Sequence, residues 1–291
     1  MNFWLDINQL FITWALPLSE ALSHFSSHSS LRDTFNRARL FALQRFLANI
    51  DMSELLPGLP ERLKAVRERF ARALSAAHRA DDAAELIAVG KTFPVSAVEL
   101  AWECGARAFG ENYVQEGVEK IQYFREHHPE DLPVWHFIGP LQSNKTRPVA
   151  EHFDWVHSID RLKIAQRLSD QRPEGMPPLN VLIEVNVSRE DSKSGVAPEE
   201  ALALAREVAA LPRLKLRGFM AIPAPSTDSE ARRAPFRALR ELLHEAQKTL
   251  PELDTLSMGM SADMEEAILE GATFVRVGSA IFGPRDYSKT R

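Results

Sequence analysis

One cysteine, Cys104, is all that the 291-residue sequence contains, so the chain can form neither an internal disulfide nor a thiolate metal cluster. This scarcity is typical of a protein from a reducing compartment, and we expect a cytoplasmic location. Positive charge is also in short supply, because 35 basic residues stand against 40 acidic ones and give a net charge of −5. The basic surface that binding to a nucleic-acid backbone requires is therefore missing. Zinc ribbons, thioredoxin-type redox sites and nucleic-acid partners are all disfavoured.

Long hydrophobic runs are missing near the amino terminus. The apolar stretch over residues 10–18 is nine residues long, and no Lys or Arg occurs before Arg32. Such a stretch is too short to span a bilayer, and it lacks the positive flank of a signal peptide. We therefore expect no membrane partner.

Residues 1–51 differ in composition from the rest of the chain. His24 and His28 are four residues apart, as two metal ligands on one helix face would be, but no third ligand lies nearby, and we expect no metal site. We interpret residues 1–51 as a poorly packed extension, with Met52 as a candidate physiological start. Residues 52–291 are then expected to form one domain.

This domain begins with an amphipathic helix and continues as a series of short strands. After Pro60, which suits a first helical turn, apolar residues recur at helical spacing at Leu63, Val66, Phe70 and Leu74. Short apolar or β-branched runs follow, each with Gly, Asn, Ser or Pro at or next to its end, and we interpret each as followed by a helical pattern. The eight runs cover residues 86–91, 108–113, 134–140, 154–160, 181–188, 214–222, 255–260 and 274–282.

The alternation of strands and helices predicts the fold class. It requires parallel strands joined by helical crossovers, as in α/β proteins. Eight such units in about 240 residues match the size of a single closed (β/α)8 TIM barrel. A doubly wound open sheet is the alternative, because the pattern alone does not show closure.

The first candidate site residue is Lys91, at the end of the first run. Chemistry in these barrels lies at the carboxyl ends of the strands. The two-residue period of a strand places Ile87, Val89 and Lys91 on one face. If that face points inward, desolvation lowers the pKa of the Lys91 amine and favours its attack on a carbonyl. The alternative is a lysine that reaches solvent at a strand end.

Glycine and serine residues end the last two runs. Ser257 lies in the seventh run, and Gly278 and Ser279 lie in the eighth, in the region where such barrels usually bind phosphate. Arg276, within the apolar eighth run, requires an anionic or acceptor partner, and an internal salt bridge would also explain it. A lysine, a phosphate site and an arginine on one rim together indicate a phosphorylated aldehyde whose ring offers an acceptor.

Seven motifs, in the same order along the chain, resemble those of the pyridoxal phosphate homeostasis proteins. They are AVGKT (88–92), FGENYVQE (109–116), WHFIGPLQSNK (135–145), SKSG (192–195), GFMAI (218–222), LSMGMSADM (256–264) and VRVGSAIFG (275–283). The likeness extends from Met52 to the end of the chain. It implies a barrel like the amino-terminal domain of alanine racemase, the fold of type III pyridoxal phosphate enzymes.

The resemblance also implies a set of cofactor contacts. Pyridoxal 5′-phosphate would be held as an imine on Lys91, with Asn112 nearby. Arg276 would face the pyridine nitrogen, and a group of small residues would contact the phosphate. These residues are Ser257, Gly278 and Ser279. In bacterial relatives a second lysine often stands two positions after the imine lysine, but Phe93 occupies that position here.

Two functions are compatible with this resemblance. An amino-acid racemase requires a second acid or base, usually a tyrosine, on the opposite face of the substrate. Only Tyr113, Tyr123 and Tyr287 are available, and an arginine at the pyridine nitrogen discourages its protonation and weakens carbanion chemistry. We therefore expect a protein without strong turnover that buffers the cofactor or delivers it to apo-enzymes.

Some polar residues have two interpretations each. Lys145 and Lys193 are either transient second amines or phosphate contacts, or else loop cations, and the last is favoured. His136 is interpreted as a hydrogen-bonded core residue, with stacking near the cofactor ring as the alternative, and Glu111 either orients Asn112 or forms an ion pair. The expected partners are pyridoxal phosphate and apo-enzymes that depend on it, and the expected state is a monomer.

Overall fold

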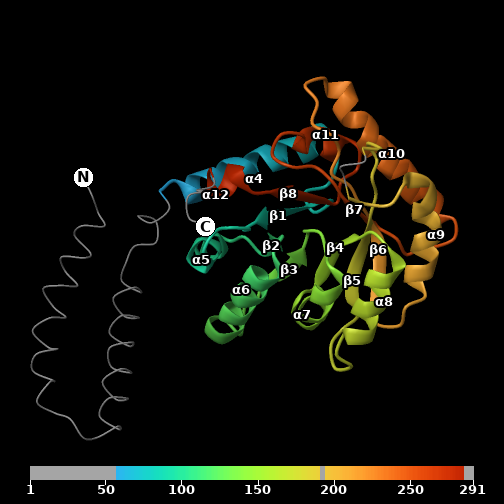
Figure 1. Cartoon of the computed structure of the whole chain (residues 1–291). Helices are drawn as coiled ribbons and strands as arrows, with labels where there is room; N and C mark the ends of the chain where they lie inside the picture. The colour runs from blue at the N-terminus through green and yellow to red at the C-terminus, as the bar shows by residue number, and fades with distance from the viewer. Residues whose placement is uncertain (1–56, 191–193, 285–291) are drawn as a thin grey trace, which may run out of the picture. The chain divides into compact units, whose positions relative to one another are not determined.

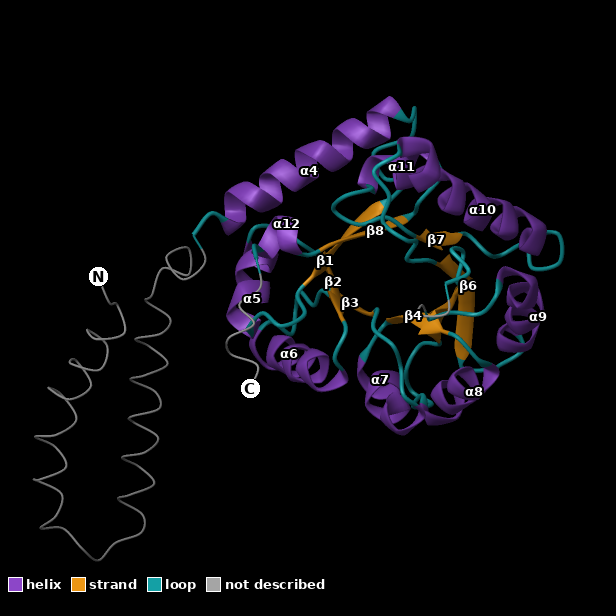
Figure 2. Cartoon of the chain, turned by 45° about the horizontal axis from the view of Figure 1, so that its top comes forward, coloured by secondary structure: helices purple, strands orange, loops and turns teal. Residues whose placement is uncertain are grey.

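Eight parallel strands form a closed barrel in the computed structural model, which describes residues 57–190 and 194–284 (Figure 2). Each strand pairs with its neighbour in sequence, and β1 also pairs with β8, with Leu86 opposite Val275. The strands are β1 (Glu85–Val89), β2 (Ala108–Glu111), β3 (Val134–Phe137), β4 (Trp155–Ile159), β5 (Leu179–Glu184), β6 (Leu214–Met220), β7 (Thr255–Ser257) and β8 (Phe274–Val277). The predicted (β/α)8 barrel is confirmed, and the open-sheet alternative is wrong.

Helices surround the barrel and cover the outer faces of its strands (Figures 1 and 2). They are α4 (Leu59–Ala76), α5 (Val95–Glu103), α6 (Val114–His127), η1 (Ser143–Lys145), α7 (Thr146–His152), α8 (Leu162–Gln171), α9 (Pro198–Ala209), α10 (Ser229–Gln247), α11 (Met264–Leu269) and α12 (Ser279–Phe282). Along α4 the apolar stripe predicted from the sequence is buried or half-buried, and Pro60 lies in its first turn. None of the helices within residues 57–190 and 194–284 is long and apolar enough to cross a membrane.

The strands divide the apolar residues between two layers. Residues that point outward pack with the helices, and those that point inward form a smaller cluster inside the barrel. Alternation along each strand produces this division, because successive side chains point to opposite faces. The inner cluster consists of Ile87, Ala108, Trp155, Leu182, Met220 and Phe274.

The strands end earlier than the sequence pattern predicts, and this corrects the placement of Lys91. β1 stops at Val89, so Lys91 does not continue the inner face of that strand. It lies in a turn in which the Phe93 N–H donates to the Gly90 carbonyl oxygen over 3.1 Å. The apolar runs extend past the strands because buried loop residues continue them.

Several expectations lie outside the described residues. These are the extension over residues 1–51 with its start at Met52, and the roles of Lys193 and Tyr287.

Candidate functional site

The predicted site residues gather at the carboxyl ends of four strands. Lys91 follows β1 in its turn, and Asn112 follows β2 directly. Ser257 is the last residue of β7, and Arg276 lies within β8. Gly278 precedes α12 and Ser279 begins it. The barrel therefore brings residues that are up to 188 positions apart, from Lys91 to Ser279, to one rim.

Arg276 is the buried cation of this rim. It shares the inward face of β8 with Phe274, and only 4% of it is exposed. Its Nη1 donates to Ser257 Oγ over 2.5 Å, and its Nη2 donates to the Ala221 carbonyl oxygen over 3.0 Å. Within the described part of the chain no carboxylate forms a salt bridge with it, so the alternative of an internal salt bridge is wrong. Burial lowers the pKa of Arg276 to about 10, and it remains protonated at neutral pH.

Two neutral histidines continue from Arg276 into the barrel. Ser257 Oγ lies 2.8 Å from His157 Nδ1, and His157 Nε2 lies 3.0 Å from His136 Nδ1. Both rings are fully buried, and burial lowers the pKa of His136 to about 3 and that of His157 well below its ordinary value. His136 stacks on Trp155 with ring centroids 5.6 Å apart. The interpretation of His136 as a hydrogen-bonded core histidine is confirmed.

Glu184 brings a carboxyl group to the same rim, at the end of β5. Only 7% of it is exposed. Burial raises the pKa of Glu184 to about 7, nearby Asp160 raises it further, and the charge of Arg276 opposes both effects. Glu184 is therefore partly protonated near neutral pH.

Two glycines lie where neighbouring loops of the rim meet, and Gly139 makes the closer approach. A Cβ atom on Gly278 would lie 3.4 Å from the Val89 carbonyl oxygen, so the loop after β8 rests against the end of β1. A Cβ atom on Gly139 would lie 2.2 Å from the Asn112 carbonyl oxygen, which leaves room for glycine alone. Asn112 Oδ1 is buried and has no hydrogen-bond donor within residues 57–190 and 194–284. An unsatisfied buried acceptor of this kind is costly unless a ligand or water supplies a donor.

Glu111 forms a buried ion pair behind this rim. Lys120 Nζ on α6 lies 2.7 Å from Glu111 Oε1 and donates to the Gly90 carbonyl oxygen over 2.9 Å. Burial raises the pKa of Glu111 to about 7 in spite of Lys120. Of the two interpretations of Glu111, the ion pair is confirmed.

The remaining candidates lie away from these contacts. Lys145 is exposed at the end of η1. Tyr123 donates to Glu99 between α6 and α5, and Tyr113 is 53% exposed.

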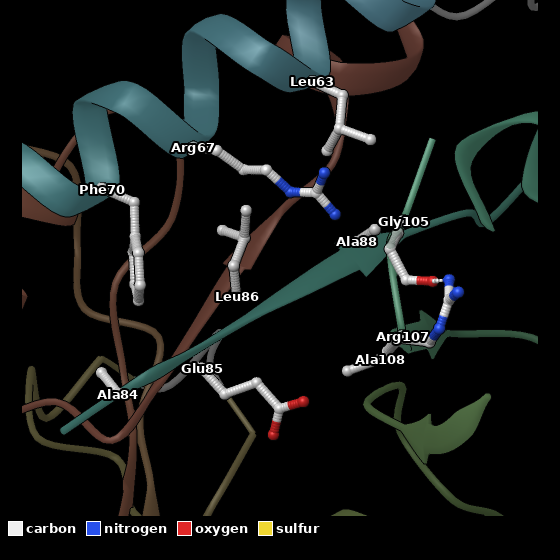
Figure 3. A pocket seen from close by; sticks show the side chains of 11 residues that line it. Leu63, Arg67, Phe70, Ala84, Glu85, Leu86, Ala88, Gly105, Arg107 and Ala108 are labelled. Atoms are coloured by element: carbon white, nitrogen blue, oxygen red, sulfur yellow. Dashed lines mark hydrogen bonds between the residues drawn. The ribbon is translucent and has the colours of Figure 1, made fainter. Parts of the chain in front are cut away.

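A cavity of about 270 Å³ lies on the outside of the barrel (Figure 3). Arg67 and Leu63 of α4 line it together with Leu86 and Ala88, whose side chains point outward from β1. Since chemistry in these barrels occurs at the carboxyl rim, this cavity is not the site.

Sequence reasoning missed His157, Glu184, Gly139 and Lys120, and also Glu116 of α6, whose Oε2 accepts a hydrogen bond from the Thr92 N–H over 2.9 Å. A histidine within the apolar strand Trp155–Ile159 was a usable signal, because buried polar side chains need partners. Glu116 and Lys120 are four residues apart on α6, a spacing that places both on one helix face. No signal in the sequence indicated how tightly Gly139 approaches Asn112.

The fold and site define a class of barrel proteins. The family model described as "Alanine racemase, N-terminal domain" matches residues 62–286. Alanine racemase from Corynebacterium glutamicum has the same fold, with a TM-score of 0.54 and 19% identity over 78% of this chain and 63% of the racemase.

Curated relatives are more similar than the racemase. The pyridoxal phosphate homeostasis protein of Vibrio cholerae is 59% identical over 211 residues, which cover 72% of this chain and 89% of the relative. That of Escherichia coli K12 is 54% identical over 227 residues, covering 78% and 97%. The structure of PipY from Synechococcus elongatus with pyridoxal phosphate bound has a TM-score of 0.63 and 35% identity over 74% of this chain and all of PipY. The chain belongs to the pyridoxal phosphate homeostasis protein family.

Proposed function

We propose that this chain binds pyridoxal 5′-phosphate covalently through Lys91 and takes part in the intracellular homeostasis of this cofactor. The observation that carries the proposal is Arg276, a buried cation without a carboxylate partner among the described residues, at the rim where Lys91 lies. A buried charge of this kind is stabilised by an acceptor that a ligand supplies. PipY, a relative 35% identical to this chain, has been solved with the cofactor bound.

The residues of the rim fit this cofactor. Its aldehyde condenses reversibly with a primary amine, which Lys91 provides. Arg276 would donate to the pyridine nitrogen, and the buried Asn112 Oδ1 offers an unused acceptor close by. The first N–H groups of α12, at Ser279 and Ala280, have no partner within the helix. Together with Gly278 they would contact the phosphate.

Ser257 would support the site through Arg276. Its hydroxyl is fully buried and already lies within hydrogen-bond distance of Arg276 and His157. We therefore propose that Ser257 holds the guanidinium in position. A contact between Ser257 and the phosphate, which the resemblance implies, stays a prediction.

Buffering or delivery of the cofactor is the role that the site supports best. A positively charged Arg276 at the pyridine nitrogen disfavours protonation of that nitrogen and so weakens the ring as an electron sink. The curated relatives are named for homeostasis of the cofactor. Apo-enzymes that depend on pyridoxal phosphate would then be the recipients, and the chain would act in the cytoplasm as a monomer.

An amino-acid racemase is the second candidate, because alanine racemase shares the fold. A racemase requires a second acid or base opposite the lysine. Tyr123 is held by Glu99 on the outer helices, and Tyr113 is largely exposed, so neither offers a buried proton donor. Stereospecific turnover of alanine or serine above the rate with free cofactor would favour the racemase.

The covalent site is tested by reduction with borohydride after the protein is loaded with pyridoxal phosphate. Peptide mass mapping is expected to find the adduct on Lys91, and Lys91→Ala is expected to lose both the adduct and the imine absorbance. Lys145→Ala, which removes an exposed amine of η1, is the matched control and is expected to keep both. An adduct that persists in Lys91→Ala would refute the proposed site.

A further inference from the structure

The turn that carries Lys91 is attached to helix α6 at two points, on either side of the lysine. On one side, Lys120 Nζ donates to the Gly90 carbonyl oxygen over 2.9 Å. On the other side, the Thr92 N–H donates to Glu116 Oε2 over 2.9 Å. Glu116 and Lys120 are separated by one helical turn and lie on the same face of α6. The peptide groups before and after Lys91 are thereby both fixed to one rigid helix.

The backbone of this turn is strained. Thr92 has φ = +68°, a left-handed conformation that a β-branched residue rarely adopts. Such conformations persist only where surrounding contacts hold them, and they concentrate at functional sites. Two hydrogen bonds are made at this turn: the Thr92 N–H donates to Glu116, and the Phe93 N–H donates to the Gly90 carbonyl oxygen. The φ angle of Thr92 and the two hydrogen bonds to α6 are separate observations on one turn, formed by Gly90, Lys91 and Thr92.

A buried carboxyl group holds the attachment between Lys120 and Gly90 in place. Glu111 is fully buried at the end of β2, and its Oε1 lies 2.7 Å from Lys120 Nζ. A Cβ atom on Gly90 would lie only 2.9 Å from the same Oε1 atom, so Glu111 packs directly beneath the turn. This ion pair is therefore part of the support for Lys91, because it holds the Lys120 ammonium that donates to the Gly90 carbonyl oxygen in addition to the Phe93 N–H.

We infer that Glu116, Lys120 and Glu111 are positioning residues that fix the turn of Lys91 for covalent capture of an aldehyde. This inference rests on the proposed function, because it gives Lys91 the covalent role. Capture requires the amine to approach the carbonyl carbon along a defined direction, and small displacements of a reacting group cost large factors in rate. Because the peptide groups before and after Lys91 are both hydrogen-bonded to α6, the position of the Lys91 Cα atom is restricted.

The test compares three single variants on α6. Glu116→Ala removes the acceptor of the Thr92 N–H, whereas Glu116→Gln keeps an amide oxygen that can accept the same bond. Glu119→Ala is the matched control, because Glu119 is exposed and its carboxylate accepts only from Gln115, over 2.8 Å, among the hydrogen bonds of the described residues. The rate of adduct formation with pyridoxal phosphate is followed by absorbance, and thermal unfolding is measured on each variant.

Glu116→Ala is expected to slow adduct formation about fivefold to tenfold, the factor that one hydrogen bond supplies. Glu116→Gln and Glu119→Ala are expected to stay within about twofold of the unmodified chain, because both keep an acceptor for the Thr92 N–H. If Glu116 had only a structural role, Glu116→Ala would lower the unfolding temperature but would not slow adduct formation selectively, and Glu116→Gln would not restore the rate. Equal rates in Glu116→Ala and Glu119→Ala would overturn the inference.

A double variant tests the attachment between Lys120 and Gly90 without leaving a buried charge unpaired. Glu111→Gln combined with Lys120→Met removes both charges and the donor to Gly90. It is expected to remain folded and to form the adduct more slowly than the unmodified chain, and an unchanged rate would contradict the inference. The two proposals fail differently: if the unmodified chain forms no adduct on Lys91, the proposed function is wrong, whereas an adduct that forms equally fast in all variants refutes the positioning role alone.

Discussion

Replacement of Glu184 by glutamine is expected to change the pH dependence of stability. The Glu184 carboxyl is 7% exposed at the end of β5, and burial raises its pKa from the ordinary value of 4.5 to about 7. Below pH 4.5 the group is protonated in both the folded and the unfolded chain, so it adds no penalty. Between pH 4.5 and pH 7 the unfolded chain releases this proton while the folded chain keeps it, and stability falls. Above pH 7 the penalty stays constant.

The size of this penalty follows from the shift in pKa. One pKa unit corresponds to about 1.4 kcal/mol, so the shift of Glu184 destabilises the folded chain by up to about 3 kcal/mol above pH 7. Glutamine has nearly the same shape and carries no charge at any pH. Glu184→Gln is therefore expected to match the unmodified chain near pH 4.5 and to be more stable at pH 8.

The assay is denaturation by urea of the chain without cofactor, at several pH values between 4.5 and 8. The pH-dependent effect of Glu111 is present in both proteins and cancels in the comparison. Glu130→Gln, at an exposed turn, is the control and is expected to show no pH-dependent difference. A difference between Glu184→Gln and the unmodified chain that does not grow with pH would refute the assignment of a raised pKa to Glu184.

Three further substitutions test the rim and the barrel wall. Gly139→Ala places a Cβ atom 2.2 Å from the Asn112 carbonyl oxygen, so it is expected to reduce the affinity for pyridoxal phosphate, measured by absorbance titration, and wild-type affinity would contradict the described packing. Gly218→Ala, at φ = +152°, places a Cβ atom 2.0 Å from the Thr255 carbonyl oxygen; it is expected to destabilise the barrel by about 3 kcal/mol or more in thermal unfolding, and a small effect would speak against this register. Arg276→Met removes charge-assisted hydrogen bonds and is expected to weaken cofactor binding at least about tenfold, whereas unchanged binding would exclude the arginine from the site.

The fold was predictable because it depends on local patterns. Strands and helices alternate along the chain, which requires parallel strands with helical crossovers, and the eight units match the size of a barrel, although the pattern did not show closure. The ends of the strands were less predictable. In the sequence, the two-residue period of β1 continues to Lys91. The strand nevertheless stops at Val89, because the chain turns at Gly90 and Thr92.

The sequence by itself, through its motifs, predicted the site residues: a lysine at the end of the first strand, an arginine in the last, and small residues beside it. Only the tertiary structure decided how they are supported. Arg276 bonds Ser257 and the Ala221 carbonyl oxygen, and α6 holds the turn of Lys91 from both sides. These contacts join residues from different strands and helices. The spacing of apolar residues in the sequence could not predict them, because it indicates only which residues share a face of one helix or strand. Closure of the barrel is what brings them within hydrogen-bond distance.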